Sequence, residues 1–334
     1  MTEQLTFLDR ATVLDCAAEV DLCGVVEDTL RSHARGSVVL PAEGYLPWTN
    51  DAGAYCRSLA MLGAVEGPDG GTVRGVKIIN AATSNPQLGR ERAAGLCVLF
   101  DHDTARPLVL AEAGWLSAAR TAAYTMVSLR HLGPRAWDAL TVIGCGTLAR
   151  IHVELLRTAF PEVRTVHLYD QLPERSKELA EELRRSRPEL SVRLAPEART
   201  AVESAPVLVT TTTTAEGYVP AAWLAPGSFV AHVSLADLLP DAFETAEKLY
   251  VDDVELVADN PRRILGGLLG QGRIARASLS TLGEVLTGRA PAVRPGAGHV
   301  ISNPFGMAIL DVALLGAVHE VAARRQLGRT LTLF

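Results

Sequence analysis

The chain has 334 residues, of which 48% are hydrophobic and 21% charged, and its formal net charge is −6 at pH 7. This length predicts two domains with substantial cores, and the composition excludes a disordered chain. The negative charge argues against nucleic acid as a main partner, and no apolar run is long enough to span a membrane. The acidic N-terminal segment lacks a signal-peptide core, and the five scattered cysteines form neither a zinc pattern nor a disulfide framework. We therefore expect a cytoplasmic protein without a metal site.

The first 132 residues predict short strands joined by turns. A strand at 5–8 precedes a helical region, and 36–56 is rich in glycine, proline and turn residues. A long helix is expected at 117–132. Short strands with hairpin-like turns indicate an antiparallel or mixed sheet. The strand-like segments lie at 54–64, 72–79, 95–101 and 107–113.

The following region alternates strands and helices around a glycine loop. A buried strand at 139–143 leads into the spacing G-x-G-x-x-A, and an amphipathic helix follows. Gly144 permits the tight turn, Gly146 lets a pyrophosphate approach the backbone, and the small Ala149 lets the helix pack against the strand. The helix N-terminus offers N–H groups and a positive dipole end to the phosphates. The predicted cofactor-binding residues of this loop are Gly144, Gly146, Thr147, Leu148 and Ala149.

A second strand at 163–169 ends in Asp170, 24 residues after Gly146. A carboxylate there can hydrogen-bond the ribose hydroxyls and repels a 2′-phosphate, which favours NAD over NADP. Further strands are expected at 192–194, 205–210, 229–233 and 248–252. Ligands bind at the C-terminal ends of such strands, so the polar residues that follow them are expected to face the cofactor. These residues are Thr211, Thr212 and Ser234.

The C-terminal segment predicts a return of the chain to its first part. The segment 303–325 predicts a long apolar helix that begins at Pro304 and must be buried. The alternating tail that follows indicates an edge strand. The predicted fold class is α/β: a Rossmann-type, doubly wound NAD domain plus a discontinuous α+β domain. The NAD domain is expected at 133–302. The domain for substrate binding and dimerisation is expected at 1–132 and 303–334.

Lys77 stands out because the chain has three lysines (Lys77, Lys177 and Lys248) and therefore 32 − 3 = 29 arginines. It lies in the apolar stretch R-G-V-K-I-I-N. A desolvated lysine can lose its proton, unlike an arginine, which suits proton transfer. The alternative is a strand lysine whose ammonium group reaches solvent.

Several motifs together resemble the ornithine cyclodeaminase/μ-crystallin family over nearly the whole chain. They are Lys77, N-P at 85–86, E-R-A-A-G at 91–95, L-S-A-A-R-T-A-A at 116–123 and the glycine loop V-I-G-C-G-T-L-A. Others are similar to the branch that makes 2,3-diaminopropionate for siderophores and peptide antibiotics. They are Y-D-Q at 169–171, V-D-D at 251–253, L-T-G at 286–288, N-P-F-G-M-A-I at 303–309 and the T-L-T-L-F tail.

The resemblance implies a homodimer that uses NAD and a small amino-acid conjugate. The expected reaction is the oxidation and hydrolysis of N-(2-amino-2-carboxyethyl)-L-glutamate to 2,3-diaminopropionate and 2-oxoglutarate, with NADH formed. By motif position, cationic side chains hold the substrate carboxylates, and a residue beside them contacts the cofactor. The cationic residues are Arg57, Lys77, Arg92 and Arg120, and the cofactor residue is Thr121.

Asp237, in S-L-A-D, matches the catalytic aspartate of the cyclodeaminases. We assign water activation to Asp237 and carboxylate contact to Lys77, although either can take the amine proton. Cyclodeaminases carry a second carboxylate six positions later, where this chain has Phe243. They also carry Gly-Gly before the aspartate, where this chain has Leu235 and Ala236. Both departures count against ornithine cyclisation.

Other functions stay open on the sequence alone. An ornithine or lysine cyclodeaminase uses NAD without net redox change, and an NAD(P)H-dependent imine or ketimine reductase or opine-type dehydrogenase runs the hydride the other way. A ligand-binding protein keeps the cofactor fold without turnover. Each charged candidate also has a purely structural alternative, such as a capped helix end or a solvated charge.

Overall fold

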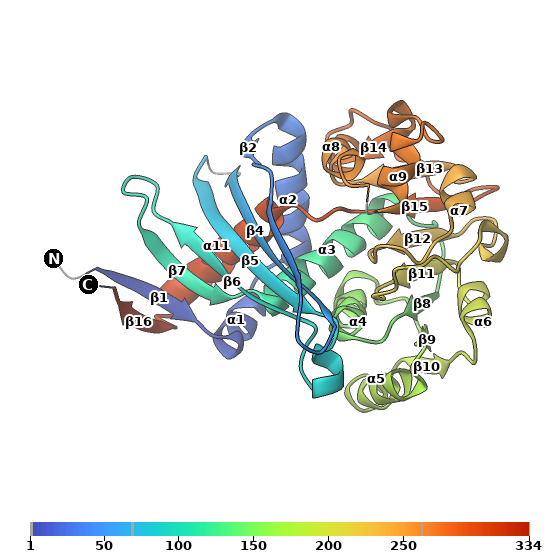
Figure 1. Cartoon of the computed structure of the whole chain (residues 1–334), viewed down its shortest axis with the longest axis horizontal. Coiled ribbons are helices and arrows are strands. Elements are labelled where there is room, and N and C mark those ends of the chain that lie inside the picture. The colour runs from blue at the N-terminus through green and yellow to red at the C-terminus, as the bar shows by residue number, and fades with distance from the viewer. Residues whose placement is uncertain (1–2, 68–69, 262, 334) are drawn as a thin grey trace. The chain divides into compact units, whose positions relative to one another are not determined.

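The computed structural model of the protein describes residues 3–67, 70–261 and 263–333. The chain divides into two compact units, Met1–Arg120 with Gly306–Phe334, and Thr121–Phe305. Helix α3 (Gly114–Leu132) carries the chain from the first unit into the second. Figure 1 shows a sheet in each unit, and the fold is the α/β class that the sequence predicts.

The first unit contains a mixed sheet of eight strands in the order β16-β1-β7-β6-β5-β4-β2, with β3 also paired to β4. Its pairs are antiparallel except β1 with β7. The expectation of a mixed sheet is therefore confirmed. The strands are β1 (Gln4–Leu8), β2 (Val38–Val39), β3 (Gly44–Thr49), β4 (Tyr55–Glu66), β5 (Thr72–Ala82), β6 (Ala93–Phe100), β7 (Pro107–Glu112) and β16 (Arg329–Thr332).

Strand β3 lies in the stretch for which the sequence predicted turns. It pairs on one side with β4 and is largely exposed, and Pro47 sits within it. Proline lacks an N–H donor and is tolerated in edge strands. The glycine and proline content that indicated a loop is therefore compatible with a strand at this place.

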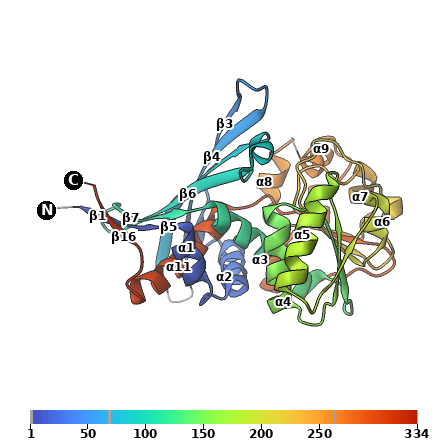
Figure 2. The same ribbon diagram turned by 90° about the horizontal axis from the view of Figure 1, so that it is seen from below.

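Helices cover one face of the first sheet. Helix α11 (Ala308–Arg324) packs against β4, β5 and β6, and also against α1 (Arg10–Ala17) and α2 (Leu22–Arg35). Figure 2 shows α1, α2 and α11 together on that side of the strands. The prediction that the apolar C-terminal helix is buried is confirmed, but its expected start at Pro304 is wrong. Gly306 has φ 103°, which no right-handed helix contains, so α11 begins at Ala308.

The second unit contains a parallel sheet of eight strands in the order β10-β9-β8-β11-β12-β15-β13-β14. The chain winds outward from β8 in both directions, as in a doubly wound sheet. The strands are β8 (Ala139–Ile143), β9 (Thr165–Tyr169), β10 (Ser191–Leu194), β11 (Val207–Thr210), β12 (Phe229–His232), β13 (Lys248–Val251), β14 (Leu279–Thr281) and β15 (Val300–Ser302).

The helices of the second unit follow its strands. They are α4 (Thr147–Ala159), α5 (Pro173–Ser186), α6 (Ala198–Glu203), α7 (Pro240–Glu244), α8 (Val254–Ala258), α9 (Ile264–Gly270) and α10 (Leu282–Leu286). Strand β14 ends at Thr281, and α10 begins at the next residue, Leu282. The side chains of Thr281 and Glu284 form a capping box, so strand and helix meet without a loop.

Candidate functional site

Three charged side chains meet inside the first unit. Lys77, in β5, is 1% exposed, and its Nζ donates to Oδ2 of Asp311 at 2.7 Å. Nε of Arg120 lies 3.3 Å from the same oxygen, and Lys77 Nζ lies 3.4 Å from Oγ of Ser117. Lys77 therefore does not reach solvent within this unit, and a buried carboxylate joins it to Arg120.

Burial lowers the pKa of Lys77, the Asp311 carboxylate raises it, and the nearby Arg120 lowers it further. The net direction is downward, so Lys77 gives up its proton more readily than an ordinary lysine. Cys97 lies opposite Lys77 on β6. Burial, together with the charge of Asp311, raises the pKa of the Cys97 thiol to about 12, so it stays protonated near neutral pH.

Gly306 makes room for the guanidinium group of Arg120. A Cβ at Gly306 would lie 2.9 Å from Nη1 and 3.0 Å from Nη2 of Arg120, and its φ of 103° disfavours any other residue. Nε of Arg120 faces Asp311. Within the described part of the chain, its two terminal amino groups have no hydrogen-bond partner. These donors are available to a ligand carboxylate.

Arg57 and Arg92 form a second group of cations. Arg57, in β4, is opposite Ala81, which lies four residues after Lys77 on the same face of β5. Four strand positions correspond to about 13 Å. Arg92 precedes Ala93, which is opposite Ala81 from the other side. Burial and the charge of Arg57 both lower the pKa of Arg92. Neither arginine has an acidic partner within residues 3–67, 70–261 and 263–333.

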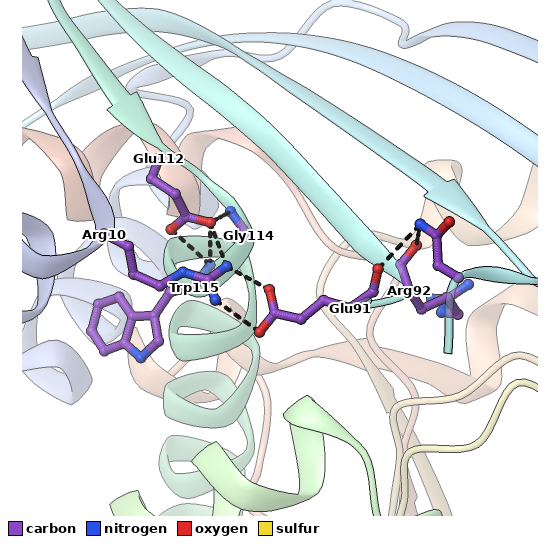
Figure 3. A network of polar contacts seen from close by, with 7 residues as sticks. Arg10, Glu91, Arg92, Glu112, Gly114 and Trp115 are labelled. Carbon is purple, nitrogen blue, oxygen red and sulfur yellow. Dashed lines mark hydrogen bonds and ion pairs between the residues drawn. The ribbon is translucent and has the colours of Figure 1, made fainter. Parts of the chain in front are cut away.

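A polar network surrounds the backbone next to Arg92. Arg10 donates to Glu91 at 2.8 Å and 2.5 Å, and to Glu112 at 2.7 Å. Figure 3 shows Arg10 between the two carboxylates, with Glu112 facing the first backbone N–H groups of α3. The side-chain amide of Asn85 donates to the carbonyl groups of Glu91 and Arg92. This network fixes the segment that presents Arg92.

The glycine loop of the second unit has the predicted strand, turn and helix. Gly144 has φ 89°, and a Cβ there would lie 2.8 Å from the backbone nitrogen of Thr212. A Cβ on Gly146 would meet nothing within 4 Å. Helix α4 begins at Thr147 and Leu148 without a side-chain cap. The space beside Gly146 and the first turn of α4 fits a phosphate group.

Asp170 lies at the end of β9 and faces the glycine loop. Its Oδ2 accepts from the backbone nitrogen of Cys145 at 2.8 Å, and its Oδ1 from that of Leu172 at 2.9 Å. Ala149, by contrast, is fully buried and packs inside the unit. Thr211 donates to the carbonyl oxygen of Gly144 at 2.7 Å, so its hydroxyl holds the loop in place. Thr121 lies in α3, beside Arg120 in the chain.

Asp237 is fully buried in the second unit and is surrounded by hydroxyl groups. Thr212 Oγ1 donates to both carboxylate oxygens at 2.8 Å and 2.9 Å, and Tyr218 Oη donates to Oδ1 at 2.8 Å. Burial raises the pKa of Asp237, and hydrogen bonds from Ser234, Tyr218 and Thr212 oppose that rise. Ser234 also contacts Thr210 at 2.7 Å. A carboxyl group with a raised pKa is suited to proton transfer.

No helix of the described residues is long and apolar enough to cross a membrane. Those residues also contain no group of three or more histidine, cysteine or acidic side chains placed to hold a metal ion.

The model of the Ornithine cyclodeaminase/mu-crystallin family matches residues 5–326 of this chain. The chain belongs to the ornithine cyclodeaminase/μ-crystallin family. It is 27% identical to the N-((2S)-2-amino-2-carboxyethyl)-L-glutamate dehydrogenase of Staphylococcus aureus (strain NCTC 8325 / PS 47), over 100% of both chains. It is 54% identical to CmnK, whose crystal structure matches with a TM-score of 0.95 over 99% of each chain.

An archaeal alanine dehydrogenase dimer with bound NAD is 24% identical, with a TM-score of 0.85 over 99% of this chain and 100% of that one. At this level of identity the similarity shows the fold.

The sequence analysis took Phe243, Leu235 and Ala236 as departures from the cyclodeaminase pattern, and the structure shows where these residues lie. Phe243 is 2% exposed and packs in the core of the second unit, with its ring against His232. Ala236 is also buried, whereas Leu235 is exposed.

The sequence analysis did not identify two residues of these clusters. Asp311 is a single acidic residue in the first turn of the apolar helix α11, and a charge in such a helix is a usable signal. Tyr218 lies in an irregular segment after the threonine run, and nothing in its neighbours indicated a contact with Asp237.

Proposed function

We propose that this protein is an NAD-dependent dehydrogenase that acts on a C–N bond. The proposed reaction converts N-(2-amino-2-carboxyethyl)-L-glutamate, NAD and water into L-2,3-diaminopropionate, 2-oxoglutarate and NADH. We further propose that the product enters the biosynthesis of a siderophore or a peptide natural product. The full-length similarity to the Staphylococcus aureus dehydrogenase supports this choice of reaction.

The cationic side chains of the first unit carry the proposal. Arg57, Lys77, Arg92 and Arg120 contribute four positive charges and Asp311 one negative charge, which gives a net charge of 4 − 1 = +3. The conjugate carries three carboxylates. Lys77 is buried and the three arginines are partly buried, so these cations need anionic partners. Arginine binds carboxylates through two parallel hydrogen bonds. A substrate with several carboxylates suits this set better than ornithine, lysine or alanine does.

The residues of the second unit fit NAD. The open space beside Gly146 and the uncapped start of α4 suit the pyrophosphate, and the carboxylate of Asp170 suits the ribose hydroxyls. Gly144, Thr147, Leu148 and Thr211 shape the same loop. Bound NAD supplies the acceptor for the hydride that leaves the carbon next to the substrate nitrogen.

Proton transfer is assigned to the chain's own residues. Asp237 accepts the proton of the substrate amine and releases it to solvent. The ionised carboxylate then takes a proton from the water that attacks the imine carbon, and it returns this proton to the amine that leaves. Its raised pKa suits this alternation. Lys77 and Arg120 hold a carboxylate by charge-assisted hydrogen bonds. Holding the substrate in one orientation supplies a large part of the rate enhancement.

We also propose a homodimer in the cytoplasm. Leu62, Ile78 and Leu96 are 47%, 38% and 44% exposed on the sheet face opposite to Lys77, and Ile78 is paired with Leu96. A contiguous apolar face of this kind is typical of a protein interface, and a second copy would cover it. None of the five cysteines, all of which lie in the described residues, forms a disulfide bond, as is usual in reducing compartments. Light scattering of wild type and Ile78→Asp tests the dimer, because the variant should be monomeric at the same concentration.

Absorbance of NADH tests the function. Purified protein and NAD should form NADH with the conjugate and release an equal amount of 2-oxoglutarate, while L-ornithine, L-lysine and L-alanine should give no NADH. Ammonia from ornithine without net NADH would indicate a cyclodeaminase instead. Oxidation of NADH by a cyclic imine, without turnover of the conjugate, would indicate a reductase.

A further inference from the structure

Lys77, Arg120 and Asp311 form a charged triad in which Lys77 and Asp311 are buried and the Arg120 side chain is 11% exposed. Its middle member, Asp311, has no assigned role. Asp311 is fully buried, and its oxygen Oδ2 contacts Lys77 Nζ at 2.7 Å and Arg120 Nε at 3.3 Å. The chain separation between Lys77 and Asp311 is 234 residues, so α11 supplies this carboxylate to β5. Two cations and one anion leave the triad with a net charge of +1.

We propose that Asp311 is a positioning residue that keeps Lys77 protonated and fixed beside Arg120, so that the two cations together bind one carboxylate group of the substrate. The carboxylate-binding part rests on the proposed function. The effect of Asp311 on Lys77 does not.

The geometry gives Asp311 this role for two reasons. It occupies one N–H of Lys77 and the Nε of Arg120, which leaves the two terminal amino groups of Arg120 without partners among the described residues. It also halves the positive charge of the pair, from +2 to +1, which one bound carboxylate then neutralises. Without Asp311, the buried Lys77 would lie beside the partly buried Arg120 with no anion between them, and the lysine would release its proton.

The groups that face Lys77 come from three elements. Asp311 lies on α11, Arg120 and Ser117 on α3, and Cys97 on β6. Cys97 remains a neutral thiol near pH 7. Asp311 therefore favours the protonated lysine, and Arg120 disfavours it. Removal of Asp311 and removal of Arg120 should therefore shift the titration midpoint of Lys77 in opposite directions.

Nuclear magnetic resonance of the lysine side chains tests this directly. The chain has three lysines, so labelling with [ε-¹³C]lysine gives three signals, which Lys77→Met assigns and for which Lys177 and Lys248 are internal references. In Asp311→Asn the titration midpoint of Lys77 should fall by about one pH unit or more. In Arg120→Gln it should rise. If Asp311→Asn does not fold, Asp311→Glu tests the same role, because its carboxylate should keep the midpoint closer to that of wild type. A midpoint that moves in neither variant, or in the same direction in both, would overturn the proposal.

Steady-state kinetics add a second readout. In Asp311→Asn the KM for the conjugate should rise about 10-fold or more. The pH at which KM begins to increase should move downward, because deprotonated Lys77 no longer binds a carboxylate, and Asp311→Glu should restore part of the loss. An unchanged KM profile in Asp311→Asn would contradict the substrate role. A wild type that does not turn over the conjugate, but shows the two opposite shifts, would refute the proposed function and leave the positioning role supported.

Discussion

Lys77 and Asp237, the two candidate catalytic residues, are held in opposite ways. Lys77 is a buried cation with a carboxylate beside it, whereas Asp237 is a buried carboxylate among neutral hydroxyl groups. Burial lowers the pKa of the lysine and raises the pKa of the aspartate. Burial thus favours the uncharged form of both residues. The charge of Asp311 opposes this effect at Lys77, and hydrogen bonds from hydroxyl groups oppose it at Asp237.

This difference determines how each site should respond to mutation. An ion pair that loses one partner leaves a buried charge uncompensated, which is a large effect. A carboxylate that loses one of several hydroxyl donors keeps the others, so its pKa moves and the fold remains. Substitution of a hydroxyl donor to Asp237 should therefore alter the pH profile of the reaction. Substitution of a group that takes part in the reaction should lower its rate.

Asp237→Asn should have the largest effect on turnover. The amide cannot accept the amine proton or activate water, and kcat should fall about 10²- to 10⁴-fold. The matched control is Asp241→Asn in α7, where Asp241 Oδ2 accepts from the backbone nitrogen of Ala221. NADH formation under single-turnover conditions measures both. Equal losses in the two variants would remove Asp237 from the mechanism.

Substitutions in the glycine loop should separate folding from cofactor binding. Gly144→Ala introduces a Cβ 2.8 Å from backbone at φ 89° and should lower the unfolding free energy by about 1–3 kcal/mol. Gly146→Ala adds a methyl group in open space and should change stability by less than about 1 kcal/mol. Both should weaken NAD binding.

Thermal unfolding and fluorescence titration with NADH check this pair. Gly146→Ala with wild-type affinity would show that the space beside Gly146 does not receive the pyrophosphate.

Tyr218→Phe should move the acid limb of the rate profile. The Tyr218 hydroxyl lowers the pKa of Asp237, so its removal raises that pKa further. Asp237 acts as a base only when ionised, and kcat should then begin to fall at a higher pH than in wild type. A pH profile of kcat measures this. Thr212→Val, which removes a second of the three hydroxyl donors, should move the limb in the same direction. A shift to lower pH in either variant would contradict this assignment.

Arg10→Gln should have the smallest effect. Its ion pairs with Glu91 and Glu112 are partly exposed, so the loss of stability should be about 1 kcal/mol or less. Because the network fixes the segment that carries Arg92, KM for the conjugate should rise a few-fold. Arg199→Gln, which removes an exposed ion pair with Glu203, is the control and should leave KM unchanged. Equal KM values in the two variants would separate Arg10 from substrate binding.

The sequence predicted most accurately the features that depend on residues close together in the chain. The strand, glycine turn and helix around Gly144 and the carboxylate of Asp170 follow from local patterns, and the structure places them as expected. The contact of Asp311 with Lys77 joins residues 234 positions apart, and no local pattern encodes it. The late start of α11 depends on the positive φ of Gly306, which makes room for a distant arginine.

Isotope transfer from a labelled substrate tests the central claim most directly. With deuterium on the α-carbon of the glutamate moiety, mass spectrometry should find one deuterium in each NADH formed, together with an equal amount of unlabelled 2-oxoglutarate. NADH without deuterium, or deuterium retained in an amino-acid product, would show that this C–H bond does not break and would contradict the proposed reaction.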